Sequence, residues 1–553
     1  MKNIYKLGVI ITLVLVTGSC RKLDRFPLDS PSSSTFYSNK TEMDLAIAAL
    51  YNPALYIKDS EEFTDNFWNR TSVGNEIIHS TATNQSGNFL NLWTACYKAI
   101  ARANAILDNI DKPQDVTAAY RAQTAAQAKL VRAFMYYALV VKFGAVPLIT
   151  TTETLQESYN ETRTPVATIQ KFVYDELDGA AAVLPVSYTS GFQYFTKGAA
   201  LSIKARFALY SSDWTTAADA AAKVMSLNVY KLYPSYRNLF LKAGQRSSEI
   251  IASFPRSAAY NLTYSVQNDI SRLAGGFASN VPTLELIDSY ECTDGNTIDK
   301  SPLYNYKKPF ANRDPRLGAT IVTPDSTFLG FVFQNHPDST LVFSIKANKK
   351  VINVDNKNAA NPFASYTGYL FKKKVDDSVL PNYNAVDLDY ILMRYAEVLL
   401  TYAEAKVELG QIDQSVLNAI NTVRARAYGV AVTAITYYPA VTTVDQAALR
   451  RIVRRERRVE FADEGLRYAD LLRWKLAEKA FNTTIYGIPL NKADYPFPGT
   501  PTFDVDDIPS YSAFASKLSI IDKRSFNIDK NYIWPIPFAE LTLNPGLGQN
   551  PNW

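Results

Sequence analysis

Two adjacent segments with helical patterning, joined by a tight turn, constrain the fold more than any other feature of the chain. The first covers residues 199–210 and the second 216–225, with Asp213 and Trp214 at the turn. Small side chains recur along both segments and allow the two helices to pack closely. These small residues are Ala200, Ala205, Ala208, Ala217, Ala218 and Ala221. We therefore expect a helix–turn–helix unit that stacks against similar units.

Helical patterning of the same kind lies on both sides of this unit. Trp93, Cys96, Tyr97 and Ile100 fall on one face of an earlier helix, so Cys96 is interpreted as a small core residue and not as a reactive thiol. Further helices are expected over 130–141, 164–184, 389–409, 413–426, 445–462 and 466–481. Each pair resembles a tetratricopeptide unit without a strict repeat length. The sequence predicts a mainly α protein, a tetratricopeptide-like superhelix of helix pairs.

A long region of different character interrupts the helical pattern. Gly, Pro, Asn and Asp punctuate short β-prone runs there, at 250–254 and 341–343. We divide the chain into an N-terminal helical part (41–226), a loop-rich insertion with short strands (227–386) and a C-terminal helical part (387–553). Long structured loops often carry function, so the insertion is expected to hold the ligand site.

The N-terminus has the features of an export signal. Lys2 and Lys6 precede an apolar run from 7 to 16, which is too short to span a bilayer at ~20 residues. Small residues lead directly into Cys20, an arrangement that resembles a lipoprotein signal with Thr17 where Leu is preferred. We predict a signal peptide over 1–19, lipidation of Cys20 and a polar tether over 20–40. Several acyl chains on one cysteine hold a protein stably at a membrane.

The composition disfavours several classes of function. A formal charge of +5 over 553 residues provides no electrostatic footprint for nucleic acid. The chain has only two histidines, His79 and His336, which makes a Ser-His-Asp triad or a multi-histidine metal centre improbable. No nucleophile elbow, P-loop, dinucleotide fingerprint or zinc spacing occurs. We assign no catalytic residue and no metal ligand.

Six arginines crowd the segment 450–458, which raises the question of a polyanion-binding helix. Leu449, Val453 and Val459 mark an apolar stripe on this segment, and Glu456 lies among them. A buried carboxylate needs hydrogen-bonded partners, and the arginine fork provides them in bidentate form. We interpret the arginines as an internal ion-pair network that locks neighbouring helices together.

Several motifs, in order along the chain, resemble the SusD/RagB family of outer-membrane nutrient-binding lipoproteins. The most specific is the run 455–474, RERRVEF followed by EGLR and DLLRW. Others are CRKLDRFP at 20–27, LWTACY at 92–97, TKGAA at 196–200, RDPRL at 313–317, LMRYAEVLL at 392–400 and YIWPIP at 532–537. The similarity extends over nearly the whole chain after the signal peptide.

This resemblance implies a non-catalytic lipoprotein of the outer membrane, facing outward. It would bind oligosaccharides and pass them to a SusC-like TonB-dependent β-barrel. The resemblance places the ligand site partly in loops before the helix of Trp93 and partly in the insertion. The candidate ligand-binding residues are Trp68, Asn69, Arg70, Asn84, Asn88, Phe89, Tyr304 and Tyr306. Some relatives bind Ca²⁺, but no carboxylate cluster in this sequence identifies such a site.

An aromatic plate flanked by Asn and Arg donors suits a sugar ring, which has an apolar face and a rim of hydroxyls. On this interpretation Trp68→Ala weakens ligand binding and leaves the melting temperature nearly unchanged. The alternative is that Trp68 and Phe89 only pin their loops to the body, in which case Trp68→Ala causes a large loss of stability. The alternatives are a RagB-like protein that binds peptides and a lipid-anchored glycoside hydrolase. Adjacent acids such as Glu61 and Glu62 more often mark solvated loops than a hydrolytic pair.

Overall fold

The computed structural model describes residues 36–553, except 57–60, 72–74, 189–193, 357–364, 381 and 490. The predicted signal peptide, Cys20 and most of the predicted tether lie outside the described residues. Within the described part, no helix is both long enough and apolar enough to cross a membrane.

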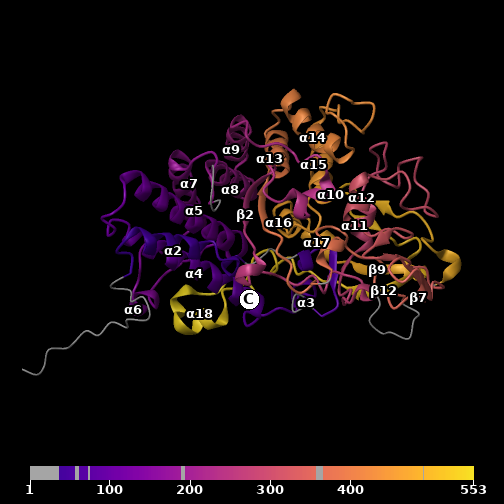
Figure 1. Ribbon diagram of the computed structural model, residues 1–553, viewed down its shortest axis with the longest axis horizontal. Coiled ribbons are helices and arrows are strands. Elements are labelled where there is room, and N and C mark those ends of the chain that lie inside the picture. The colour runs from indigo at the N-terminus through magenta and orange to yellow at the C-terminus, as the bar shows by residue number, and fades with distance from the viewer. Residues whose placement is uncertain are drawn as a thin grey trace, which may run out of the picture.

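Helices that follow one another in the chain pack side by side and form a single stack (Figure 1). After α2 (Lys40–Leu50), the stack contains α4 (Gly87–Asp108), α5 (Ala118–Phe143), α7 (Val166–Val183), α8 (Lys197–Tyr210) and α9 (Trp214–Ser226). It continues through α13 (Tyr395–Glu408), α14 (Gln414–Ala427) and α15 (Gln446–Glu460). Because α9 packs directly on α13, the two helical parts join across the insertion. The prediction of a mainly helical, tetratricopeptide-like superhelix is confirmed.

The unit α8–α9 shows why the sequence folds in this way. Thr196 caps α8 by accepting a hydrogen bond from the Ala199 amide at 3.3 Å. Asp213 caps α9 by accepting one from the Thr216 amide at 3.1 Å. The alanines on the facing sides of both helices are buried, and these include Ala200, Ala205, Ala208, Ala217, Ala218 and Ala221.

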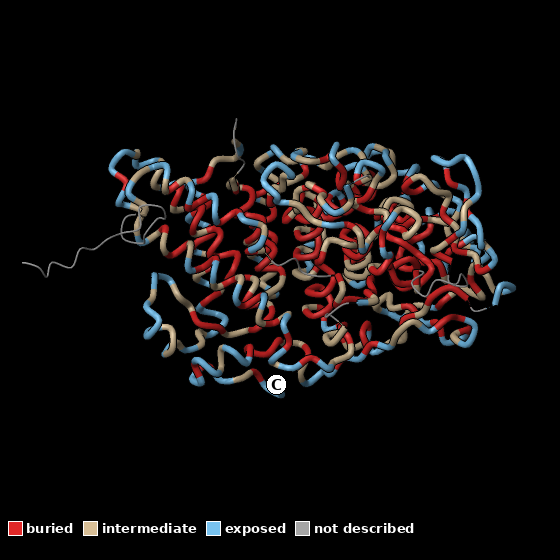
Figure 2. The backbone as a smooth tube through the Cα atoms, turned by 60° about the horizontal axis from the view of Figure 1, so that its bottom comes forward, coloured by how far each residue is buried: buried red, intermediate tan, exposed pale blue. Residues whose placement is uncertain are grey.

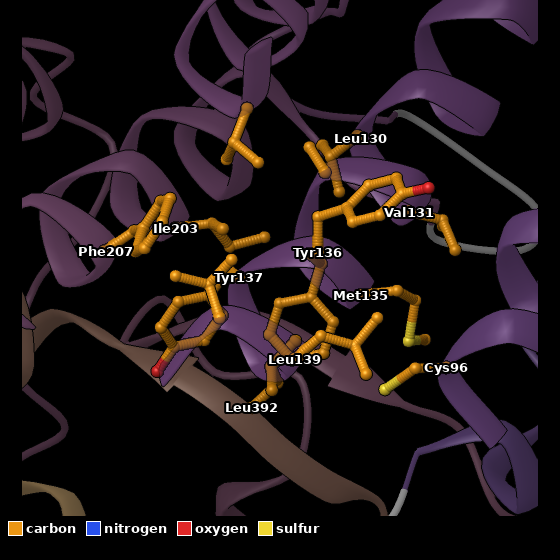
Figure 3. Packing of buried hydrophobic residues seen from close by; sticks show 14 of the residues in the cluster. Cys96, Leu130, Val131, Met135, Tyr136, Tyr137, Leu139, Ile203, Phe207 and Leu392 are labelled. Atoms are coloured by element: carbon orange, nitrogen blue, oxygen red, sulfur yellow. The ribbon is translucent and has the colours of Figure 1, made fainter. Parts of the chain in front are cut away.

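The main hydrophobic core runs along the inside of this stack. Figure 2 shows buried backbone through the helices, with exposed turns at their ends. In Figure 3, Cys96 points toward Met135 and Leu139, and Cys96 is 1% exposed. Cys96 is therefore a core residue, as predicted. On the other side of α5 the Tyr137 ring lies 5.4 Å from the ring of Phe207 on α8.

Small antiparallel sheets attach the insertion to the rest of the molecule. The strand β1 (Phe67–Asn69) pairs with β3 (Asn280–Pro282), and β2 (Ile250–Phe254) pairs with β8 (Tyr390–Arg394). The insertion also has its own four-stranded sheet, β4 (Thr327–Phe328), β5 (Phe331–Val332), β6 (Leu341–Ser344) and β7 (Lys349–Ile352). Its short helices are α10 (Tyr236–Leu239), α11 (Leu284–Ser289) and α12 (Pro315–Thr320).

The C-terminal part differs from the prediction in three places. The expected helix at 389–409 begins as β8, because residues 390–394 pair with β2, and only α13 is helical. The expected helix at 466–481 is divided into α16 (Arg467–Arg473) and α17 (Ala477–Phe481). Residues after 483 are mostly not helical: β9 (Thr484–Pro489) pairs with β12 (Leu518–Lys523), and β10 (Thr502–Phe503) pairs with β11 (Pro509–Ser510). The division into 41–226, 227–386 and 387–553 stays a prediction.

Buried ion pairs hold α15 against its neighbours. Glu460 on α15 accepts hydrogen bonds from Arg394 at 2.7 Å and from Arg316 at 2.9 Å. Arg457 reaches Asp470 of α16 at 2.9 Å. Further pairs are Arg450–Glu408, Arg455–Glu291 and Arg458–Asp65. The predicted network that locks the helices together is confirmed.

Candidate ligand-binding site

The β1–β3 ribbon brings the segment before the first long helix against the insertion. Trp68 lies opposite Val281, and Asn69 lies opposite Asn280. The Arg70 amide extends the pairing by donating to the Ser279 carbonyl at 3.1 Å. Successive side chains of a strand point to opposite faces, so Trp68 and Asn69 have different surroundings.

Trp68 lies inside the molecule. Its side chain belongs to an apolar cluster under the insertion, and the residue is 6% exposed. The indole Nε1 donates to Asp522 Oδ2 at 2.8 Å, and the same carboxylate lies 2.9 Å from His79 Nε2. The Trp68 ring centroid is 5.1 Å from that of Tyr366. Trp68 therefore supports Tyr366 from below and offers little surface to a ligand.

Arg70 and Tyr366 together form a half-buried aromatic surface at the ribbon. The Arg70 guanidinium carbon lies 5.8 Å from the Tyr366 ring centroid, within range of a cation–π contact. Burial lowers the pKa of the Arg70 guanidinium, and the charge of Arg272 acts in the same direction. A sugar ring can stack on such an aromatic ring while the guanidinium donates to its hydroxyls.

Asn69 connects this surface to a polar pocket. Asn69 Nδ2 donates to Asn280 Oδ1, and Asn280 Nδ2 donates to Asp269 Oδ1 at 2.7 Å. Asn69 Oδ1 accepts from the Thr71 amide at 2.6 Å. Asn69 is buried, so its amide holds Asn280 in place, and Asn280 is the side chain that lines the pocket.

The polar pocket has a volume of about 270 Å³ and combines charged and aromatic side chains. Its aromatic side chains are Phe67, Tyr264 and Phe371, and its polar ones are Glu61, Glu62, Asp269, Asn280, Lys373, Lys374 and Asp463. Lys374 Nζ lies 2.9 Å from Asp463 Oδ2, and Lys373 Nζ lies 2.7 Å from Glu464 Oε1. Because both lysines of the pocket are neutralised by carboxylates, its remaining amide and carboxylate groups suit a neutral ligand rich in hydroxyls.

Burial changes the titration of several groups around this pocket. It raises the pKa of the Glu61 carboxyl, and it lowers the pKa of Lys373 to about 8 although Glu464 opposes the shift. Burial also raises the pKa of Tyr264 to about 12. Glu61 accepts from Asn66 Nδ2 at 2.8 Å and from the Gly465 amide at 3.0 Å. Glu61 is thus a buried anchor for the 463–465 turn, contrary to the expectation of a solvated loop residue.

The other predicted ligand residues do not lie with Trp68, Asn69 and Arg70. The Asn84 carbonyl accepts from the Phe538 amide at 2.8 Å, and Asn88 is half-buried on the first turn of α4. Phe89 is 1% exposed, and its ring centroid lies 4.9 Å from that of Trp534. This segment is packed against the C-terminal residues, and the Phe89 side chain has almost no surface for a ligand.

Tyr304 and Tyr306 lie at a third location. The Tyr304 ring is half-buried with the Arg313 guanidinium carbon 5.5 Å from its centroid, and burial raises the pKa of Tyr304. Tyr306 is exposed beside Lys307, whose Nζ is 3.4 Å from the Ala493 carbonyl. The structure therefore brings only part of the predicted set together, and a ligand role for these residues stays a prediction.

Sequence reasoning missed Tyr366, Asn280 and Tyr264, which the structure adds to the site. Tyr366 lies in the sequence SYTGY at 365–369, and Asn280 follows a loop. The only local signal was that a Tyr and an Asn lie in a Gly- and Asn-rich insertion. Many other residues of this chain have the same surroundings. Among the residues that the structure describes, no group of three or more His, Cys, Asp or Glu could hold a metal ion.

Stacked helix pairs that carry an aromatic and polar surface built from loops are typical of a binding protein. Two family models match the chain: one described as the SusD family over residues 249–553, and one described as "Starch-binding associating with outer membrane" over residues 30–209. The chain belongs to the SusD family.

Individual relatives extend over nearly the whole length of the chain. A SusD-like protein of Formosa agariphila is 25% identical over 502 residues, which cover 85% of this chain and 90% of that protein. The crystal structure of a SusD-like carbohydrate binding protein from Bacteroides fragilis has 28% identity and a TM-score of 0.79, and covers 93% of this chain and 100% of that one. Another SusD-like protein from the same species has 23% identity and a TM-score of 0.74, with coverage of 96% and 100%.

Proposed function

We propose that this protein binds oligosaccharides at the outward face of the outer membrane and delivers them, chemically unchanged, to a SusC-like TonB-dependent barrel. A lipid on Cys20 holds the chain at the membrane. The observation that carries the proposal is the half-buried Tyr366 ring with Arg70 beside it, next to a polar pocket whose two lysines are paired with carboxylates. The relative described as carbohydrate binding supports the same ligand class.

The acids of the pocket favour binding over hydrolysis. Glycoside hydrolysis requires two carboxyl groups on opposite sides of the scissile bond, one of them a proton donor with a raised pKa. Glu61 has a raised pKa, but its two oxygens accept from Asn66 and Gly465 and hold a turn. Asp463 is engaged by Lys374. These contacts use Glu61 and Asp463 for structure and support a role without chemistry.

Calorimetry with a panel of neutral oligosaccharides tests the proposal, and chromatography of each mixture checks for products. We expect binding without any change in chain length. Tyr366→Ala should weaken the binding, whereas Tyr437→Ala, at a tyrosine 75% exposed in the 428–445 loop, should not. Release of shorter sugars would overturn the non-catalytic part. Binding of peptides in place of glycans would assign the site to the RagB-like alternative.

A further inference from the structure

A second pocket lies between α15 and the β10–β11 hairpin and is lined mainly by arginine. We call it the arginine pocket; its volume is about 250 Å³. Five of its arginines come from α15 and one from the start of α16: Arg450, Arg451, Arg454, Arg455, Arg458 and Arg467. The hairpin side contributes Phe503, Val505, Asp506 and Asp507. This pocket shares no lining residue with the polar pocket.

The carboxylates around the arginine pocket are shared between several cations. Asp507 accepts from Arg451 at 2.6 Å and from Arg455 at 2.7 Å. Asp65 lies 2.9 Å from Arg458 and 2.8 Å from Arg467. Arg450 also pairs with Glu408, and Arg455 also pairs with Glu291. The lining itself has six arginines against two aspartates, Asp506 and Asp507, so the wall of the pocket keeps a surplus of positive charge.

Arg454 is the least compensated of these side chains. Its closest carboxylate oxygen, on Asp506, is 4.0 Å away, and Asp506 is also bound by Lys479. The Arg454 Nε atom is buried and makes no hydrogen bond within the described part of the chain. Its guanidinium carbon lies 5.1 Å from the Trp474 ring centroid. An unpaired buried donor is costly unless a ligand satisfies it.

Apolar side chains line the same pocket. They are Trp474, Leu476, Phe503 and Val505, and Val505 is 73% exposed. Guanidinium groups bind carboxylate and sulfate oxygens in bidentate form. An apolar surface beside them can contact the C–H face of a sugar ring.

We infer that the arginine pocket binds the anionic group of a carbohydrate, a sulfate ester or a uronic acid carboxylate, at a site separate from Tyr366. Arg454 and Arg451 contact the oxyanion, and Phe503 and Val505 contact the ring. The inference rests on the proposed function in one respect: both take the ligand to be a carbohydrate. On this inference, the protein binds charged oligosaccharides at the arginine pocket in addition to the neutral oligosaccharides that the polar pocket suits.

Titrations with four probes test the inference: galactose 6-sulfate, galacturonate, galactose and inorganic sulfate, followed by calorimetry or ligand-observed NMR. We expect one or both anionic sugars to bind, and galactose to bind at least about tenfold more weakly because it lacks a charge-assisted contact. The two anionic sugars distinguish a sulfate from a carboxylate ligand. Binding of inorganic sulfate alone would mean an adventitious ion and would overturn the inference.

Two variants place the binding in this pocket. Arg454→Gln removes the least compensated guanidinium. Ala447→Glu puts a carboxylate at the entrance, on the exposed first turn of α15, where an acid is compatible with the helix dipole. Both should weaken binding of the anionic sugar at least about tenfold. Ala447→Gln adds the same volume without the charge and is the reference for Ala447→Glu.

Two controls separate this inference from the proposed function. Arg246→Gln, on an exposed turn elsewhere, should keep binding of the anionic sugar within about threefold. Neutral-oligosaccharide binding at Tyr366 should survive Ala447→Glu. If neutral sugars bind and anionic sugars do not, or if Arg454→Gln and Ala447→Glu leave anionic binding intact, the arginine pocket is not a ligand site and the proposed function stands.

Discussion

The Arg70 guanidinium carbon lies 5.8 Å from the centre of the Tyr366 ring. This contact joins a loop before the first long helix to the far end of the insertion. The β1–β3 ribbon sets the position of Arg70, and Trp68 packs beneath Tyr366 at 5.1 Å. Arg70 and Tyr366 therefore form an outer layer that can contact a ligand, and Trp68 forms an inner layer that supports it. The two layers should respond differently to mutation.

Tyr366→Ala should weaken binding of the preferred oligosaccharide about tenfold, because a sugar stacked on the ring loses ~1.4 kcal/mol of contact. The melting temperature should change little, because the ring is half-buried. Calorimetry and thermal melts measure the two effects. Tyr437→Ala is the matched control, and equal affinity of wild type and Tyr366→Ala would remove Tyr366 from the site.

Trp68→Ala should lower the free energy of unfolding by about 3–5 kcal/mol, since it leaves a cavity in a buried cluster. This reverses the expectation from sequence that the melting temperature would stay nearly constant. Urea denaturation measures the loss. Trp68→Phe keeps an aromatic ring but removes the hydrogen bond to Asp522, so it should be milder. An unchanged midpoint for Trp68→Ala would contradict the buried position.

Glu460→Gln should destabilise the protein by about 3–5 kcal/mol, because Arg394 and Arg316 keep their charge and lose the carboxylate that balances it. The variant is nearly isosteric, so the loss reports charge and not volume. Chemical denaturation provides the value. Asp111→Asn is the control at an acid that is 92% exposed, where the expected change is within about 0.5 kcal/mol.

Stability should fall as the pH drops from about 4.5 toward 2, in part through Glu464. Burial raises the pKa of Glu464, but Arg394 and Lys373 outweigh it and lower the pKa to about 2. A folded-state pKa below the ordinary 4.5 means that the contribution is fully present above pH 4.5 and is lost in acid, by about 3 kcal/mol. Urea titrations at several pH values measure this. Glu464→Gln should flatten the acid slope, and an unchanged slope would refute the assignment.

Cys20→Ser should abolish incorporation of labelled palmitate, because the serine cannot form the thioether to the lipid. The variant should then leave the membrane fraction. Cys96→Ser is the matched control, since Cys96 is buried in the core and should not affect labelling. Equal labelling of wild type and Cys20→Ser would refute the lipid anchor.

Periodic patterns were enough to predict the helical scaffold. Trp93, Cys96 and Ile100 recur at helical spacing, and each lies in the core. The arginines of α15 were correctly interpreted as an ion-pair network because Glu456 lies among apolar residues at helical spacing. Local patterns failed at 390–394, where pairing with β2 overrides helical propensity.

The ligand surface could be predicted only in part. The predicted ligand set combined Arg70 with Tyr304 and Tyr306 of the insertion, whereas the structure places Arg70 beside Tyr366. Phe89 and Trp68 were predicted as ligand residues because they come before or at the start of the first long helix, where the family resemblance places the site, whereas both side chains are buried. Exposure depends on the neighbours that cover a side chain, and those neighbours come from distant parts of the chain.

By itself, the sequence determined the helix pairs and the internal role of the α15 ion pairs, because these depend on spacing within one segment. It also determined the family, through motifs that follow in order along the chain. The tertiary structure alone decided which aromatic ring meets Arg70, that Glu61 is buried, and that Arg454 lies 4.0 Å from its nearest carboxylate oxygen. The physical reason is that strand pairing and loop packing bring together residues whose separation in the chain carries no periodic signal.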